Sequence, residues 1–511
     1  MDAVSPQQHA GEKMADAHEA QSDAPLRDGS RDEDTANAHP ARDHHHAPGH
    51  YRVYRRRWFG LLQLVLLNII ISWDWLTFAA VSSDSAEYFH VSESTINWLS
   101  TAFLFSFVVI SPVVLATLHR GPKPAIITAS ILTLIGNWVR YAGTRAGPHG
   151  YFGVVMFGQI LIGLAQPFVL TAPTSYSDLW FTERGRISAT ALASLANPFG
   201  GALGQLIDPF WATKPSEVPN MVLYTAIIST IASLPSFFIP ARPPTPPSAS
   251  TTTHKPTPIL PSLAHLSRTP TFWLLLLPFS IYVGFFNAFS SLLNQILYPY
   301  GFTASAAGIC GALLILIGLA AAALLSPLLD RRRPKPYIAT IKLLCPLVAL
   351  GYLAFVWAPA TRGVGAPYAI AAVLGAASFA LVPVALEYLV EATWPAASPE
   401  AGSVCCWTAG QLLGGVFVVV MDALKEPGCD STVECQEIGK HSTGSKPPGS
   451  MWRALVFQAV VALAVLPAPL LLGVRRLGLG AGHRKGRMEA EDAQGRGAVA
   501  EEGGSGEGGG S

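Results

Sequence analysis

Long apolar runs recur between residues 58 and 474 and are separated by short polar segments. Each run is close to the roughly 20 residues that a helix needs to cross a bilayer. We therefore expect an all-α membrane protein with twelve transmembrane helices in two groups of six. The runs lie near residues 58–82, 95–118, 124–142, 151–177, 188–210 and 221–240, and near 271–294, 305–328, 337–358, 365–391, 401–424 and 452–474.

The polar segments divide the chain further. Residues 1–56 and 475–511 are polar or low in complexity and lack an apolar period, which is typical of disordered tails. Residues 241–270 are rich in Pro and Thr and are interpreted as a linker. This linker would join one six-helix bundle at 57–240 to a second at 271–474.

Composition supports a protein surrounded by lipid. Half of the residues are apolar and only 13% are charged, against about 25% charged in soluble proteins. The sequence contains no phosphate-binding loop, nucleophile elbow or zinc-binding helix motif, so we expect no enzyme, cofactor or nucleic-acid partner. His44–His46 could bind a metal, but a solvated tail is the simpler interpretation, and no metal site is expected.

Positive charge sets the expected orientation. With the N-terminus in the cytosol, the inside segments hold 20 Lys and Arg residues and the outside segments hold 8. Cytosolic loops carry the excess of these residues, so both termini should be cytosolic. We expect a multi-pass monomer, with the plasma membrane as the favoured location.

The two halves contain matching segments at similar offsets, which favours duplication over chance in apolar sequence. The matches are RGPKPAIIT at 120–128 with RRPKPYIAT at 332–340, FVLTAP ending at Pro173 with FALVP ending at Pro383, and NPFGG at 197–201 with QLLGG at 411–415. Such parallel six-helix repeats resemble those of the major facilitator superfamily, whose substrate site lies near the bilayer midplane between the halves.

Charged residues near the cytosolic side of both halves suggest a gate. Charges at membrane depth usually pair with one another. Two interpretations remain open, an ionic latch that closes one state and a static structural ion pair. The residues are Arg120, Lys123, Asp178 and Glu183 in the first half, and Asp330, Arg331, Arg332, Arg333, Glu387 and Glu391 in the second.

Six motifs occur in a fixed order between about Arg55 and Leu424. They are ISWDWLTFAAVSSDSAEYF, INWLSTAFLFSFVVISP, GNWVRY, GQILIGLAQPFVLTAPTSYSDLWF, SSLLNQ and PVALEYLVEATWP. Together they resemble the feline leukaemia virus subgroup C receptor family, a branch of the major facilitator superfamily. Members are associated with choline and ethanolamine transport, haem export and, in one branch, pyridoxine uptake. The resemblance implies a transporter and leaves its cargo open.

The resemblance also implies substrate-binding residues. The family's substrate-contacting Trp of the first helix matches Trp75, and its polar cavity residues match Gln166, Asn197 and Gln411. The seventh helix departs from the pattern. Choline-transporting members have a cavity Tyr where this chain has Asn287, although Phe286 and Phe289 are adjacent and could supply aromatic surface.

The residues themselves support a cavity role for Trp75 in part. A Trp face attracts a quaternary ammonium, and Asn68, Ser72, Trp75 and Ala79 share one helix face. An interfacial belt residue is the alternative for Trp75. For Asn197 and Gln411, hydrogen bonding to a solute and helix packing beside glycines remain equally open.

Asp74 is the unusual residue of the first apolar run. Three interpretations compete: a counter-charge for a cationic solute, a proton site, or a carboxylate hydrated near the outer surface. Because Asp74 is turned about 100° from Trp75 on the helix, we expect Trp75 rather than Asp74 to contact the solute. Asp84, slightly further along, should lie in water.

Two cysteines fall in an expected outside loop. Cys429 and Cys435 lie in CDSTVEC, where oxidation is possible, and we expect a disulfide between them.

The favoured function is alternating-access transport of a small organic solute similar to choline or ethanolamine. Haem and pyridoxine-like solutes are the alternatives, as is a receptor or sensor of the same fold that moves nothing.

Overall fold

The computed structural model describes residues 54–118, 120–245, 259–330, 336–393, 399–427 and 446–474, and within them it contains helices and no strands. The first group is α1 Arg56–Ala80, α2 Ser82–Phe89, α3 Glu93–Leu118, α4 Pro122–Arg145, α5 Phe152–Trp180, α6 Glu183–Trp211 and α7 Val218–Ser233. The second group is α9 Ile259–Arg268, α10 Pro270–Leu297, α11 Ala304–Asp330, α12 Tyr337–Phe355, α13 Gly365–Thr393, α14 Pro399–Ala423, α16 Trp452–Ala464 and α17 Pro467–Leu470.

The helices confirm the expected fold class. Eleven candidate spans in the described residues are long and apolar enough to cross a membrane. The twelfth expected span corresponds to α6, which has 29 residues but is not among these eleven. Its sequence is rich in Ala, Ser and Gly, and small residues let helix backbones approach closely. At Gly200 a Cβ would lie 2.0 Å from the backbone oxygen of Ile69 on α1.

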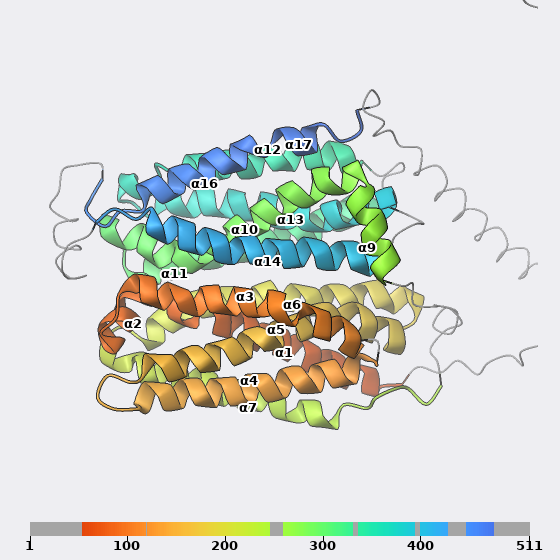
Figure 1. The fold of residues 1–511 in the computed structure, drawn as a ribbon, viewed down its shortest axis with the longest axis horizontal. Helices are drawn as coiled ribbons and strands as arrows, with labels where there is room; N and C mark the ends of the chain where they lie inside the picture. The colour runs from red at the N-terminus through yellow and green to blue at the C-terminus, as the bar shows by residue number, and fades with distance from the viewer. Residues whose placement is uncertain are drawn as a thin grey trace, which may run out of the picture. The chain divides into compact units, whose positions relative to one another are not determined.

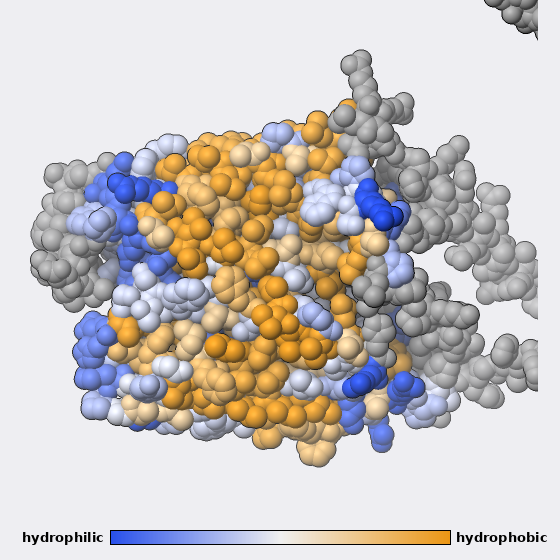
Figure 2. All heavy atoms as spheres, viewed as in Figure 1, coloured by the Kyte–Doolittle hydropathy of each residue, from blue (hydrophilic) through white to orange (hydrophobic). Residues whose placement is uncertain are grey.

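The two groups lie side by side, with α3 and α6 of the first facing α14 and α11 of the second (Figure 1). Apolar side chains cover the middle of the visible surface, and hydrophilic residues gather at its two ends (Figure 2). We call these ends the α2 end, where α1 finishes, and the α9 end, where α1 begins. An apolar belt between two polar ends is the surface that a bilayer requires.

Prolines within the helices free backbone carbonyls, and neighbouring helices use them. Pro173 has no N–H, so the carbonyl of Val169 lacks its helical donor. The Asn68 amide on α1 donates to that carbonyl at 3.0 Å. Pro209 similarly frees the carbonyl of Gln205, which lies so close to α11 that a Cβ at position 308, where Gly stands, would be 2.1 Å away.

One expectation about the connections needs correction. The segment after α1, expected as an outside loop, contains α2, and Asp84 on it is partly buried rather than fully in water. The expected linker 241–270 contains α9 and the first residue of α10, because its last third is apolar enough to form a helix that packs on α10 and α14.

Several expectations lie outside the described residues. Both tails, residues 246–258 of the linker, and the pair Cys429 and Cys435 belong to this part of the chain.

Candidate functional site

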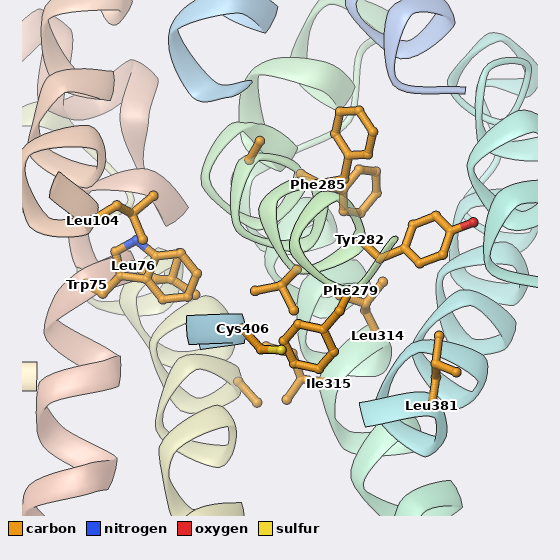
Figure 3. Close-up of a cluster of buried hydrophobic side chains, with 14 of the residues drawn as sticks. Trp75, Leu76, Leu104, Phe279, Tyr282, Phe285, Leu314, Ile315, Leu381 and Cys406 are labelled. Atoms are coloured by element: carbon orange, nitrogen blue, oxygen red, sulfur yellow. The ribbon is translucent and has the colours of Figure 1, made fainter. Parts of the chain in front are cut away.

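Trp75 lies between the two groups of helices. Its side chain is 6% exposed and stacks on Phe103 of α3, with the ring centroids 6.3 Å apart. Figure 3 shows it projecting from α1 on the side that faces Phe279 and Cys406 of the other group. The indole Nε1 has no hydrogen-bond partner in the described residues. A buried donor without a partner is unusual in proteins and marks a place where a ligand can bond.

The predicted polar residues lie at the middle of the bundle. Gln166, Asn197 and Gln411 are the central residues of α5, α6 and α14. All three are buried, and Oε1 of Gln166 has no partner among the described residues. Gln166 therefore presents an unused acceptor at the depth where transporters of this architecture bind substrate.

Asn197 and Gln411 make hydrogen bonds within their own halves. Asn197 donates weakly to Asn68, at 3.5 Å to its backbone oxygen and 3.4 Å to its side-chain oxygen. Gln411 accepts from the Asn287 amide at 2.8 Å. Gly414 lets Asn287 approach, since a Cβ there would lie 2.8 Å from its amide nitrogen. The helix-packing role is therefore observed for both amides, and solute binding by them stays a prediction.

Phe286 and Phe289 pack inside the second group. Phe289 is fully buried and meets Phe355 edge-on at 4.7 Å, while Phe286 meets Phe379 at 5.3 Å. These ring contacts lie within the second group, and a role for either ring at the solute site stays a prediction. Phe279, two turns earlier on α10, is the aromatic residue that Figure 3 shows on the side facing Trp75. No sequence signal marks Phe279, because it stands in an apolar run where every position looks alike.

Asp74 points away from Trp75, as its position on the helix predicted. It is fully buried, so the hydrated interpretation is wrong. Its Oδ1 pairs with Nη2 of Arg140 at 2.7 Å, and its Oδ2 accepts from the Asn137 amide at 2.6 Å. The carboxylate therefore already has a cation beside it, which argues against a free counter-charge for a solute.

Arg140 completes a buried polar cluster with Asp74. It is fully buried on α4 and also donates to the backbone oxygen of Asp74 at 3.0 Å, to Gln159 at 2.8 Å and to Asn137 at 2.9 Å. The sequence contained a signal for this. Asn137 and Arg140 are three residues apart and share a helix face, and an Arg inside an apolar run requires a partner.

A second buried carboxylate is Asp208 on α6, which was not among the residues predicted from the sequence. It is fully buried, and its Oδ1 accepts from Nε1 of Trp73 at 2.9 Å. Its Oδ2 has no hydrogen-bond partner in the part of the chain that the structure describes. Trp73 is held in place by stacking on Trp211, with the ring centroids 5.6 Å apart.

Polar contacts join the two groups of helices toward the α2 end. The side chain of Gln205 donates to the Ser290 carbonyl at 2.7 Å, one turn before Asp208. Further contacts at this end are Ser82 with Asn294 at 3.1 Å, Gln295 with Asn97 at 2.7 Å, Asn97 with Asp422 at 2.7 Å, and an ion pair of Lys425 with Glu93. The α2 end is therefore closed by direct bonds between the halves.

The residues of the predicted gate are only partly described. Arg331, Arg332 and Arg333 and the side chains of Asp330 and Glu183 lie outside the described residues. Arg120 and Glu387 are exposed, and Lys123, Asp178 and Glu391 are partly buried, all at the α9 end. The latch stays a prediction.

Comparisons with known proteins agree with this architecture. The family model named Major Facilitator Superfamily matches residues 64–418. Solute carrier family 49 member A3 of Danio rerio is 34% identical over 397 residues, covering 76% of this chain and 83% of that protein. Choline/ethanolamine transporter FLVCR1 of Mus musculus is 28% identical over 392 residues, covering 71% and 69%.

The solved structures give the same fold. A bacterial homologue of the human lysosomal transporter Spinster, crystallised in an inward-facing and occupied conformation, has a TM-score of 0.61 at 14% identity. The match covers 82% of this chain and 97% of the bacterial one. A D-xylose–proton symporter has a TM-score of 0.58 at 15% identity, covering 80% and 97%.

Proposed function

Because the chain belongs to the major facilitator superfamily and, within it, to the solute carrier family 49 group that includes the FLVCR proteins, we propose that it carries a small organic cation similar to choline or ethanolamine. As a member of this superfamily it is a membrane transporter. Relatives at 24–28% identity bear the name choline/ethanolamine transporter. The substrate of this chain is our inference from those names and from the chemistry around Trp75.

The observation that carries the proposal is a buried indole with an aromatic face and polar atoms without hydrogen-bond partners. Phe103 covers one face of Trp75, and we place the ammonium against the other face. Cation–π attraction contributes about 2 kcal/mol or more in a desolvated site. Nε1 of Trp75 and Oε1 of Gln166 have no partners in the described residues. They supply one donor and one acceptor for the hydroxyl of choline or the amine of ethanolamine.

Alternating access would deliver the solute to the two sides in turn. Taking both termini as cytosolic, we assign the α2 end to the outside and the α9 end to the cytosol. The bonds at the α2 end then close the outer entrance in the state described here. Opening that entrance requires the halves to separate at Gln205 and Asn97, whose partners lie on α10 and α14.

The proposal is tested with purified protein in liposomes and labelled choline, ethanolamine and pyridoxine, with haem binding followed by absorbance. Trp75→Ala should abolish uptake of the true substrate, while Trp75→Phe should keep part of it because a weaker ring face remains. Trp138→Ala is the matched control, since Trp138 is 43% exposed and its indole Nε1 donates to the Thr230 hydroxyl at 3.0 Å.

Each alternative function gives a distinct result in the same experiment. Binding of choline without accumulation would identify a receptor or sensor. Preferred uptake of pyridoxine, or binding of haem alone, would replace the cation as substrate. Normal choline uptake by Trp75→Ala would contradict the site itself.

A further inference from the structure

Asp208 is a buried carboxylate that substrate binding at Trp75 does not use. It lies three residues before the end of α6, so it is about 5 Å inside the α2 end of that helix. Its side chain has no exposed surface, and only one of its oxygens has a partner. An ionised carboxylate in such a place is strongly unfavourable unless a cation lies beside it.

The charges around Asp208 do not balance. The charged groups that act on it, among the described residues, are Arg140 of α4 and Asp74 of α1. The guanidinium of Arg140 is held by Asp74 at 2.7 Å. Two carboxylates therefore share one fixed cation, which leaves a net charge of −1 in a region without exposed surface. One bound proton removes that charge.

Among the described residues, the other elements packed against this stretch of α6 supply no compensating cation. On α7 the titratable group is Tyr224, which meets Trp211 edge-on. The hydroxyl of Thr77 on α1 lies beside the carboxylate and donates to the Trp73 carbonyl at 3.2 Å. On α11 it is Cys310, whose thiol is directed to the Pro367 carbonyl at 3.6 Å. None of these neutral groups offsets a carboxylate charge.

Asp208 also lies next to the contact that closes the α2 end. Gln205, one turn earlier on the same helix, donates to Ser290 of the other half at 2.7 Å. Pro209, the following residue, lies against α11 at Gly308. The stretch of α6 that carries the unpaired carboxylate is thus the stretch that must move away from the other half when this end opens.

We propose that Asp208 is the proton-binding site of the transport cycle. While the α2 end is closed, Oδ2 holds a proton taken from water, and the buried cluster is neutral. When the halves separate there, water reaches Asp208, the carboxylate becomes the stable form and the proton leaves to that side. Proton binding at Asp208 and closure of the α2 end stabilise each other, because the proton binds more tightly in the closed conformation than in the open one.

This assignment differs from a proton site at Asp74. Asp74 accepts bonds from both Arg140 and Asn137, and a proton on it would break one of them. In Asp208, Oδ2 has no hydrogen-bond partner among the described residues, so a proton there breaks no hydrogen bond. Asp74 with Arg140 therefore acts as a fixed ion pair that positions the cluster, and Asp208 exchanges the proton.

Infrared spectroscopy of the purified protein tests the assignment without using a solute. At about pH 7 a free carboxyl is ionised, so a protonated buried acid gives a separate C=O stretching band. The band should disappear in Asp208→Asn. It should also disappear in Asp74→Asn, because Arg140 then pairs with Asp208 and ionises it. The exposed Glu387→Gln is the matched control and should keep the band.

Transport supplies the second measurement, and the inference rests on the proposed transport function only there. Uptake by the unaltered protein should depend on pH on the α2 side, and Asp208→Asn should lose that dependence. A band unchanged in Asp208→Asn, or an Asp208→Asn protein that fails to fold although it exchanges one neutral group for another, would overturn the proton site. Loss of the band in a protein that moves no tested solute would instead refute the proposed substrates and leave the proton site standing.

Discussion

Replacing Arg140 by Met should cause one of the largest losses of stability that a single change can produce in this protein. The side chain donates to Asp74 at 2.7 and 3.0 Å, to Gln159 at 2.8 Å and to Asn137 at 2.9 Å. Met fills similar volume but supplies none of these bonds. Removing one partner of a buried ion pair costs about 3–5 kcal/mol, because the other charge stays buried and uncompensated. We expect a loss of that size in the free energy of unfolding.

The companion variant separates the charge from the packing. In Asp74→Asn with Arg140→Met, no uncompensated carboxylate remains at position 74, so part of the loss should be recovered. Contacting residues typically couple by 0.5–3 kcal/mol, and we expect a coupling near the upper end, at about 2–3 kcal/mol. The assay is reversible unfolding in mixed detergent micelles, followed by Trp fluorescence. If the double variant is as unstable as the two single losses added together, the ion pair contributes nothing to the free energy of unfolding.

Three further outcomes follow from contacts at the helix interfaces and the α2 end. Gly200→Ala should destabilise by about 1–3 kcal/mol because its Cβ would lie 2.0 Å from the α1 backbone, whereas the control Gly365→Ala meets nothing within 4 Å; unfolding of both variants measures this. Exchanging the charges as Glu93→Lys with Lys425→Glu should restore the closure of the α2 end that either single reversal weakens, measured by the accessibility of a cysteine placed between the halves. Burial and the neighbouring Glu87 carboxylate raise the pKa of Asp84 to about 6. The stabilisation from its protonated form is therefore complete below about pH 4 and is lost as the pH rises through 6. Asp84→Asn should flatten this pH dependence of the free energy of unfolding.

Much of the architecture could be predicted because lipid imposes a simple rule on sequence. A spanning helix must be apolar over about 20 residues, so the helix positions follow from the apolar runs. The offset between the halves and the central positions of Gln166, Asn197 and Gln411 also follow from the sequence. The direction of Asp74 relative to Trp75 followed from helix geometry alone.

The buried cluster could not be predicted in the same way. Its partners come from α1, α4, α5 and α6, and no spacing along the chain reveals contacts between helices that are distant in sequence. Arg140 and Asp208 both lie near the ends of apolar runs, where a charged residue is usually solvated. Only the packed bundle shows that both side chains are fully buried. Phe279 was missed for the opposite reason, because it looks like every other core residue.

The bond from Asn68 to the Val169 carbonyl has a consequence for how relatives can differ. The acceptor exists only because Pro173 removes the backbone N–H that would otherwise occupy it. A descendant that replaces Pro173 regains the helical bond and no longer needs an amide on α1. One that replaces Asn68 alone leaves a buried carbonyl without a donor, which selection disfavours. The two positions are 105 residues apart. They should therefore co-vary when homologous sequences are compared.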